Sequence, residues 1–350
     1  DLAGYNWIPI GNEDECFTGK LNGCGYYISN LSIARDRKNN GLFGMTDTGA
    51  GIYNLGIINC NINASISNAG GIAGTISKTE IVNCYVNGNI SSSNIGGIVG
   101  SAWNSKIQYC YNKAALSRYA PSNANLVAGG IVGYCEGTEI SSCYNLGNIQ
   151  GSESIADRRF CYWYIGGIIG DSENGKNIIN NCYNLGNIDV YTMAAFIYGG
   201  GLIGRIGSNK QTHTVVIENL KITDSTVKSD AADSCGGLFG YQWLNTDVTL
   251  KNVTVSGSKV SSSGIFGGLV YRATGYWKIG SENTSDAGIT FKEAANQFTG
   301  KTSADTPSAL LIASTASDND SVKTRAYIEI LKDGLDIQKD AVAVTLDGGA

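Results

Sequence analysis

Short segments in which apolar and polar residues alternate follow one another through most of this chain, separated by glycine and asparagine. Examples are IVNCYVNGNI (81–90), IQYCYNKAAL (107–116), ISSCYNLGNI (140–149) and IINNCYNLGNI (178–188), with an earlier copy LGIINCNINASI (55–66). Each phrase joins two short β-rich segments through a turn signal such as Asn-Gly, which predicts strands of three to five residues. No stretch keeps a 3.6-residue apolar period, so few helices are expected.

A second phrase, Gly-Gly-apolar-apolar-Gly, lies between these segments. It occurs as GGIAG (70–74), GGIVG (96–100 and 129–133), GGIIG (166–170), GGLIG (200–204) and GGLFG (236–240), with degenerate copies GLFG (41–44) and GGLVY (267–271). The marker glycines 41, 71, 97, 130, 167, 201, 237 and 268 are therefore 26 to 37 residues apart. Self-similarity at such a period predicts a repeat architecture, in which each unit buries its apolar face against its neighbours.

Composition agrees with stacked strands. The 350 residues include 47 glycines and only 3 prolines, which suits many tight corners and a backbone that donates hydrogen bonds almost everywhere. A net charge of −5 argues against nucleic-acid binding, which needs a basic stripe. The sequence contains no run of 18 or more apolar residues, so membrane insertion is not predicted. Patterned sequence reaches both ends, so we expect the chain to be part of a longer polypeptide.

Five of the ten cysteines, 60, 84, 110, 143 and 182, fall in the same phrase. At one position of successive repeats they would stack as buried free thiols rather than form a disulfide framework. Cys16 and Cys24 are close enough in sequence to form a disulfide with each other, which stays an alternative. Asn83, Asn112, Asn145 and Asn184 occupy comparable turn positions, which predicts side-chain ladders along the stack.

These phrases resemble a known family. GGIVG followed by I-x-x-C-Y-N-x-G-x-I is similar to the GLUG-motif repeat of bacterial secreted and cell-surface proteins, and NWIPIGNEDECFTGKLNGCGYYISNLSI (6–33) resembles the segment that commonly precedes such repeats. The resemblance covers residues 6–204 closely and 205–271 loosely. It implies a right-handed parallel β-helix of the kind found in adhesin-like proteins and in the non-catalytic region of immunoglobulin A proteases.

The predicted fold is all-β, a right-handed parallel β-helix (β-solenoid) with a less regular C-terminal region. We expect residues 1–280 to form the β-helix, with a lead-in segment at 1–40 and repeats at 41–271. Residues 281–350 are predicted to form irregular loops and terminal strands or a cap. For the segment 325–337, RAYIEILKDGLDI, a short helix around 324–332 is an alternative prediction.

Few residues predict catalysis. The single histidine, His213, lies in a polar stretch and is expected at the surface, and neither H-E-x-x-H nor G-x-S-x-G occurs. The acidic pairs Asp171/Glu173 and Asp230/Asp233 fall in predicted turns, while Ser101 or Arg205 stands at equivalent positions of other repeats. We therefore expect dispersed acids, no catalytic residues, no metal site and no cofactor. The acidic loops 171–174 and 317–320 carry only a weak calcium signal.

Aromatic residues are the predicted ligand-binding residues. Trp103 and Trp243 each follow a tetrad by three residues, and RRFCYWYIGG (158–167) and YRATGYW (271–277) are rich in rings. Such side chains bury area yet keep a polar handle. The predicted residues are Trp103, Arg159, Tyr162, Trp163, Tyr164, Trp243 and Trp277. The competing hypothesis is that these rings fill hydrophobic positions under loops.

The sequence thus predicts a non-catalytic segment of a large bacterial secreted or cell-surface protein, acting as a rigid scaffold or adhesin. Its partner would be a host or environmental glycan or a surface protein. Three other hypotheses stay open: a substrate-presenting accessory region of an immunoglobulin A-type zinc metallopeptidase, a polysaccharide lyase or glycoside hydrolase of the β-helix type, and a purely architectural stalk.

Overall fold

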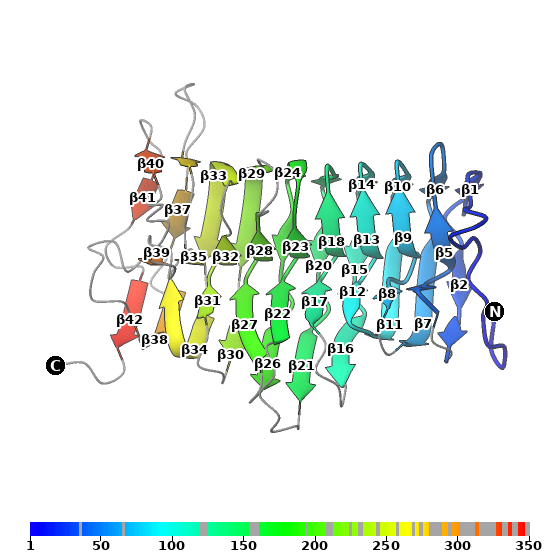
Figure 1. Ribbon diagram of the computed structural model, residues 1–350, viewed down its shortest axis with the longest axis horizontal. Coiled ribbons are helices and arrows are strands. Elements are labelled where there is room, and N and C mark those ends of the chain that lie inside the picture. The colour runs from blue at the N-terminus through cyan, green and yellow to red at the C-terminus, as the bar shows by residue number, and fades with distance from the viewer. Residues whose placement is uncertain are drawn as a thin grey trace.

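The protein is built from parallel strands, and the described part of the chain contains no helix (Figure 1). The computed structural model describes the backbone of residues 1–346 except 35–36, 65–66, 120–124, 154–160, 193–194, 208–212, 224–225, 230–233, 243–245, 257–258, 268–269, 273–275, 280–288, 293–295, 302–311, 315–326, 331–334 and 338–341. Side chains are described as far as Val253, with further gaps. Within this part, no helix is long and apolar enough to cross a membrane.

One sheet of nine strands carries the residues that end each glycine tetrad and those that follow it. Its strands are β5 (Phe43–Thr46), β9 (Ala73–Ser77), β13 (Val99–Trp103), β18 (Val132–Glu136), β23 (Ile169–Ser172), β28 (Ile203–Ile206), β32 (Phe239–Gln242), β35 (Val270–Arg272) and β39 (Ile312–Ser314).

The other strands form a second, larger sheet. Those that lead into the tetrads are β4 (Asn39–Asn40), β8 (Asn68–Ala69), β12 (Asn94–Gly96), β17 (Leu126–Gly129), β22 (Cys161–Gly166), β27 (Ala195–Gly200) and β31 (Ser234–Gly236). The remaining ones are β1 (Lys20–Asn22), β2 (Tyr27–Ser29), β3 (Ser32–Ile33), β6 (Gly51–Tyr53), β7 (Gly56–Asn63), β10 (Glu80–Val82), β11 (Tyr85–Ser91), β14 (Lys106–Gln108), β15 (Tyr111–Asn112), β16 (Ala115–Tyr119), β19 (Glu139–Ser141), β20 (Tyr144–Asn145), β21 (Ile149–Glu153), β24 (Gly175–Asn180), β25 (Tyr183–Asn184), β26 (Ile188–Thr192), β29 (His213–Thr223), β30 (Thr226–Ser229), β33 (Thr246–Ser256), β34 (Lys259–Gly267), β36 (Tyr276–Ile279), β37 (Ile289–Lys292), β38 (Asn296–Lys301), β40 (Tyr327–Ile330), β41 (Leu335–Ile337) and β42 (Val342–Leu346).

Each strand pairs in parallel with the strand one repeat away in the sequence, so equivalent residues become neighbours. Val132 of β18, for example, pairs with Val99 of β13 below and Ile169 of β23 above. Along the chain, the path runs from a strand pair such as β10 and β11 through β12 to β13 and then returns to β14 beside β10. This is a β-helix-like arrangement, and it confirms the all-β, parallel part of the sequence prediction.

The same parallel pairing continues beyond residue 281, where the sequence predicted irregular loops and terminal strands or a cap. Strands β40, β41 and β42 pair in parallel with β36, β37 and β38. Strand β40 occupies Tyr327–Ile330, within the segment that left a short helix open. No tetrad marks these strands, because backbone pairing needs no particular side chain.

The turn before the position that holds Leu55 in one repeat and a cysteine in the following ones uses left-handed backbone. Asn54, Asn83, Tyr109, Ser142 and Asn181 have φ between 51° and 56° at equivalent positions of successive repeats. Asparagine tolerates this conformation better than other non-glycine residues, so its frequency at this turn has a backbone cause.

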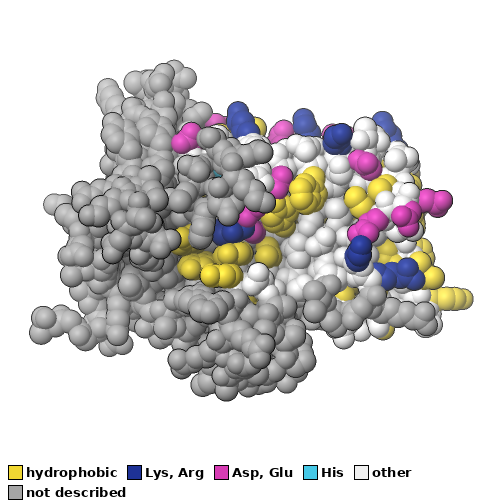
Figure 2. Space-filling view, viewed as in Figure 1, with side chains coloured by type: hydrophobic (Ala, Val, Ile, Leu, Met, Phe, Trp, Pro, Cys, Tyr) yellow, Lys and Arg dark blue, Asp and Glu magenta, His cyan; other side chains and the backbone are white. Residues whose placement is uncertain are grey.

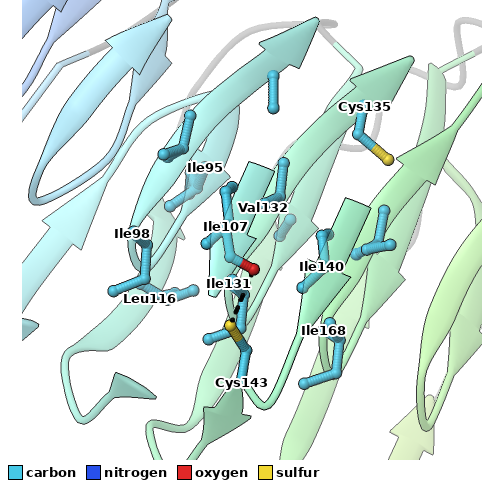
Figure 3. Packing of buried hydrophobic residues seen from close by; sticks show 14 of the residues in the cluster. Ile95, Ile98, Ile107, Leu116, Ile131, Val132, Cys135, Ile140, Cys143 and Ile168 are labelled. Carbon is cyan, nitrogen blue, oxygen red and sulfur yellow. Dashed lines mark hydrogen bonds between the residues drawn. The ribbon is translucent and has the colours of Figure 1, made fainter. Parts of the chain in front are cut away.

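The interior is a continuous column of aliphatic side chains and thiols (Figure 3). Isoleucines from equivalent positions, such as Ile107 and Ile140, stack on one another. Cys143 lies beside them, and its thiol donates to the carbonyl of Ile107 at 3.5 Å. Both apolar residues of a tetrad are buried, as Ile98 and Val99 illustrate, so the chain bends beside the glycines and no outward apolar ribbon forms from these pairs.

Four of the five predicted cysteines stack as buried free thiols: Cys84, Cys110, Cys143 and Cys182. Cys60 is also free and buried, but it pairs with Gly88, and Leu55 is the residue that lies below Cys84. The prediction was therefore wrong for Cys60, because matching the phrase by its cysteine shifts that repeat out of register. Cys16 and Cys24 are free as well.

The asparagine prediction also needs one correction. Asn145 accepts a hydrogen bond from Asn112 at 2.9 Å and donates to Asn184 at 2.8 Å, which makes a buried ladder. Asn83 is not part of it, because Val86 occupies the equivalent position. Asn83 belongs to an exposed ladder at the left-handed turn and donates to Asn54 at 2.7 Å.

Candidate functional site in the tetrad corner

The outer surface folds inward where each tetrad bends the chain. At the third glycine of a tetrad there is no room for a side chain: a Cβ on Gly133 would lie 2.2 Å from Asn94 Oδ1 and 2.6 Å from the carbonyl oxygen of Gly100. Because the third glycine of each tetrad has no side chain, the side chains of the strands before and after the tetrad contact each other there. Asn94 and Ser101 do so through a 2.8 Å hydrogen bond. We call this inward fold the tetrad corner.

Two columns of side chains fill the tetrad corner, and each changes character along the stack. The column before the tetrad runs through Asn68, Asn94, Val127, Tyr164 and Tyr198. The column after it runs through Thr75, Ser101, Tyr134, Asp171, Arg205 and Tyr241. Small polar residues thus give way to aromatic and charged ones in the middle repeats. On the face in Figure 2, hydrophobic, acidic and basic side chains lie next to one another in this region.

Arg205 and Asp171 form the centre of the charged part. The guanidinium donates from Nε to Oδ1 of Asp171 at 2.8 Å and from Nη2 to Oδ2 at 2.5 Å, which is a bidentate pair. Nη2 also donates to Glu173. The guanidinium carbon lies 4.3 Å from the ring centroid of Tyr164, a cation–π contact. Asp171 is only 3% exposed, so the pair is held in a nearly dry environment.

Two further carboxylates lie on the outer side of this pair. The hydroxyl of Tyr134 donates to Glu136 and lies 3.4 Å from Oε2 of Glu173. Glu136 also accepts from the side-chain amide of Asn174 at 2.7 Å. The other amide atom, Oδ1 of Asn174, is buried and has no hydrogen-bond partner among the described residues. The corner thus holds an acceptor that lacks a donor.

Trp103 and Tyr134 form what we call the aromatic shelf. Their ring centroids are 5.4 Å apart with an interplanar angle of 45°. Trp103 pairs in backbone register with Glu136 of the next repeat, so the two side chains leave the sheet on the same face. With 39% of its surface exposed, Trp103 is the described tryptophan that is open to solvent.

Burial perturbs the titration of the groups in the corner. It raises the pKa of Asp171 to about 6, against the opposing effect of Arg205. Burial, together with the hydrogen bond to Glu136, raises the pKa of the Tyr134 phenol far above its usual range. Burial also raises the pKa of the Tyr164 phenol, although Arg205 acts in the opposite direction. Both tyrosines are therefore neutral donors at physiological pH.

The structure brings only some of the predicted ligand-binding residues together. Trp163 is 1% exposed and faces the core, where its ring occupies the space that a side chain at Gly151 would need. Tyr164, the next residue, faces the tetrad corner, and Tyr162 stacks near it with centroids 6.2 Å apart. Trp163 is thus a core residue, as the competing hypothesis for these rings states.

The other predicted residues are remote from the shelf or outside the described part. Trp277 lies on β36 in register with Val248, and only its backbone is described. Arg159, Trp243 and the pair Asp230/Asp233 lie outside the described residues. Their assignment as binding residues stays a prediction.

His213 is buried rather than at the surface. Its Nδ1 lies 3.0 Å from the carbonyl oxygen of Gly175, and its Nε2 lies 3.1 Å from Oγ of Ser172. A carbonyl can only accept, so Nδ1 carries the proton and the Ser172 hydroxyl donates to Nε2. Burial lowers the pKa of this imidazole. The polar sequence around His213 gave no sign that the side chain closes a buried hydrogen-bond chain.

The expectation of dispersed acids is also wrong. Asp171 and Glu173 contact Arg205, and the hydroxyl of Tyr134 lies between Glu173 and Glu136 of the preceding repeat. The sequence comparison covered position one after each tetrad, where Ser101 and Arg205 stand, whereas the site also includes position three, where Glu136 and Glu173 lie. Aligning the tetrads and reading those two positions upward would have found it.

The class of protein that these features define is an all-β, parallel, β-helix-like protein with an aromatic and charged corner. No family model matches the chain. Its fold is similar to the crystal structure of a Bacteroides ovatus protein that is provisionally named an immunoglobulin A1 protease, with a TM-score of 0.52 and 20% identity over 69% of this chain and 74% of that one. At this identity the likeness concerns the fold alone.

A second similarity concerns sequence. A segment of 80 residues, 22% of this chain, is 40% identical to part of halomucin from Haloquadratum walsbyi. The match spans only 1% of halomucin. The resemblance to the β-rich region of immunoglobulin A proteases is thus supported at the level of fold, and the GLUG motif itself stays a prediction.

Proposed function

We propose that this chain is a non-catalytic, right-handed β-solenoid segment of a secreted or cell-surface bacterial protein, and that it binds a glycan on the aromatic shelf. The observation that carries the binding part is the position of Trp103, a solvent-exposed indole beside Tyr134 that pairs in backbone register with Glu136 of the next repeat. An aromatic face next to fixed polar groups suits a sugar ring, which has apolar C–H faces and hydroxyl edges.

The polar groups around the shelf are fixed in advance. Glu136 is held by Tyr134 and Asn174, and Glu173 is held by Arg205. A ligand that hydrogen-bonds to these carboxylates loses little affinity to side-chain ordering, because the side chains are already restrained.

A peptide fits this surface less well than a glycan does. Strand β13 pairs with β9 and β18, and β18 pairs with β13 and β23. The backbone groups under the shelf are thus engaged on both sides, and no free strand edge is left there to pair with an extended peptide. Recognition has to come from side chains.

The charge arrangement argues for binding rather than catalysis. A general acid or base must reach the substrate, and Asp171, the carboxyl group whose pKa is raised toward neutrality, is buried with both oxygens engaged by Arg205. The Ser172–His213 pair is equally closed, since both residues are 0% exposed. We also propose a location at the cell surface, which the similarities to the Bacteroides ovatus protein and to halomucin support.

A glycan array tests the binding proposal. We expect saturable binding of at least one glycan by the wild-type protein, and at least a roughly tenfold loss of affinity in Trp103→Ala, since a stacking contact of about 1.5 kcal/mol is removed. Tyr109→Asn is the matched control, because it removes an exposed ring elsewhere at a left-handed position that asparagine tolerates. Absence of saturable binding, or equal binding by Trp103→Ala, contradicts the proposal.

A second candidate function is presentation of a substrate to a zinc peptidase domain elsewhere in the same polypeptide. The fold likeness to the Bacteroides ovatus protein favours it. The parent gene decides between the two: a downstream H-E-x-x-H motif supports presentation, and a surface-anchoring signal without a peptidase supports the adhesin.

A further inference from the structure

We infer that the glycan bound at the aromatic shelf carries a free, protonated amine, as an unsubstituted amino sugar does. The inference rests on the proposed function and specifies its ligand. It is carried by the register of Trp103 with Glu136 and by the charge balance of the described residues of the tetrad corner.

The charge balance of the corner is negative. Its described residues include three carboxylates, Glu136, Asp171 and Glu173, and one guanidinium, Arg205. Asp171 and Glu173 engage Nε and Nη2 of Arg205, and its guanidinium lies against Tyr164. Among the described residues the corner therefore presents carboxylates in excess of cations, and an anionic ligand would meet repulsion from them.

The hydrogen-bonding groups at the shelf are mainly acceptors. Glu136 and Glu173 accept only, and Oδ1 of Asn174 is a buried acceptor beside Glu136 that has no donor. Tyr134 donates its one proton to Glu136, and the amide nitrogen of Asn174 donates one of its two protons to the same carboxylate. An ammonium group brings three donors and no acceptor, so it complements this set better than a hydroxyl or an acetamido group.

The indole adds a second attraction of the same sign. Trp103 pairs in backbone register with Glu136 and is 39% exposed, and an indole ring attracts a cation through its quadrupole. A hexosamine stacked on the ring can place the ammonium on its C2 near the carboxylate of Glu136. A neutral hexose could stack on the ring but would leave the carboxylate without a cation.

Three β-1,4-linked hexasaccharides separate these possibilities, because they differ only at C2: glucosamine, N-acetylglucosamine and glucose. With isothermal titration calorimetry at low ionic strength, we expect the glucosamine hexamer to bind roughly tenfold tighter than the other two, and the preference to shrink as salt is added. Glu136→Gln should abolish the preference while keeping the shape of the side chain. Glu139→Gln is the matched control, because that glutamate lies on β19 in the other sheet and pairs with Lys106.

The outcomes distinguish the two levels of the proposal. Equal, Trp103-dependent binding of all three hexamers would overturn the amine and leave glycan binding standing. No binding of any of them, together with an empty glycan array, would overturn both. If a lysine oligopeptide of matched charge binds as tightly as the glucosamine hexamer and also depends on Trp103, the occupant is a cationic peptide and the inference is wrong. Circular dichroism checks that Glu136→Gln is folded, and Glu173→Gln provides a second, independent removal of charge.

Discussion

Arg205 holds Asp171 with two parallel hydrogen bonds, although 34 residues separate them in the sequence. The contact exists because β23 and β28 pair in register, so the first residue after one tetrad meets the first residue after the next. In the middle repeats this pair of charged residues occupies the position in the tetrad corner that Thr75 and Ser101 occupy in earlier repeats.

Removing one member of this pair should be costly. Arg205→Met leaves Asp171 buried without its counter-ion, and we expect a loss of about 3 kcal/mol in the free energy of unfolding, measured by urea denaturation. The double variant Asp171→Leu/Arg205→Met should regain most of it, since no unpaired charge is left. A single variant as stable as wild type would show that the pair contributes nothing.

The glycines of the tetrads should tolerate no side chain. A Cβ on Gly130 would lie 2.1 Å from the carbonyl oxygen of Gly167 in the next repeat, and backbone cannot move without separating the repeats. We expect Gly130→Ala to lower stability by about 3 kcal/mol or more, or to prevent folding. Gly19→Ala is the control, because its closest contact is the movable ring of Phe17 at 3.1 Å. Equal stability of both variants in thermal denaturation would refute the steric argument.

His213 should make the protein sensitive to acid. Burial lowers its pKa below the usual 6.5, so its contribution to stability is fully present above pH 6.5 and is lost as pH falls through the lower, folded-state value. The chain has one histidine, so its imidazole signals in NMR are unambiguous, and their midpoint should lie below 6.5.

Asp171 acts in the opposite direction over the same range. Because its pKa is raised to about 6, its contribution favours folding below about pH 3.8 and is lost as pH rises through 6.

The contribution of His213 is separated from that of Asp171 by comparing the stability of His213→Gln with that of wild type between pH 8 and 5. If the variant loses stability on acidification as steeply as wild type does, the histidine is not responsible.

Thiol labelling should divide the cysteines by burial. Cys24 is exposed and Cys16 is partly exposed, whereas Cys60, Cys84, Cys110, Cys135, Cys143 and Cys182 are buried. Burial also raises the pKa of Cys60 to about 11, which suppresses the reactive thiolate. We expect iodoacetamide to modify Cys24 and Cys16 in the native protein and the six buried thiols only after unfolding, as read by peptide mass spectrometry. Rapid native labelling of Cys143 would contradict the stacked interior.

The repeat period was enough to predict parallel strands, buried thiols and the bend beside Gly-Gly, because each depends on residues that recur at one position. It failed where a repeat departs from the pattern. Leu55 replaces the cysteine of its repeat, and Val86 replaces the asparagine, so matching letters misplaced Cys60 and Asn83. Local sequence could not place Trp163 either, since the direction of a side chain in RRFCYWYIGG depends on strand register, and a shift of one residue exchanges Trp163 with Tyr164.

The candidate site was the least predictable part. Trp103 was identified from its position after a tetrad, and its role as a binding residue stays a prediction. Glu136 and the contacts of Arg205 could not be found within one loop, because they form only between successive repeats.

No single repeat contains both the shelf and its carboxylates. Gene rearrangements that delete or duplicate a repeat would therefore change which residues are neighbours on this surface. Deleting the unit 171–204 would preserve the aliphatic interior and the backbone ladder, yet it would bring Tyr134 beneath Arg205 instead of Asp171. Unequal crossing-over between such units would therefore generate new combinations of surface residues on an unchanged frame, without any point mutation.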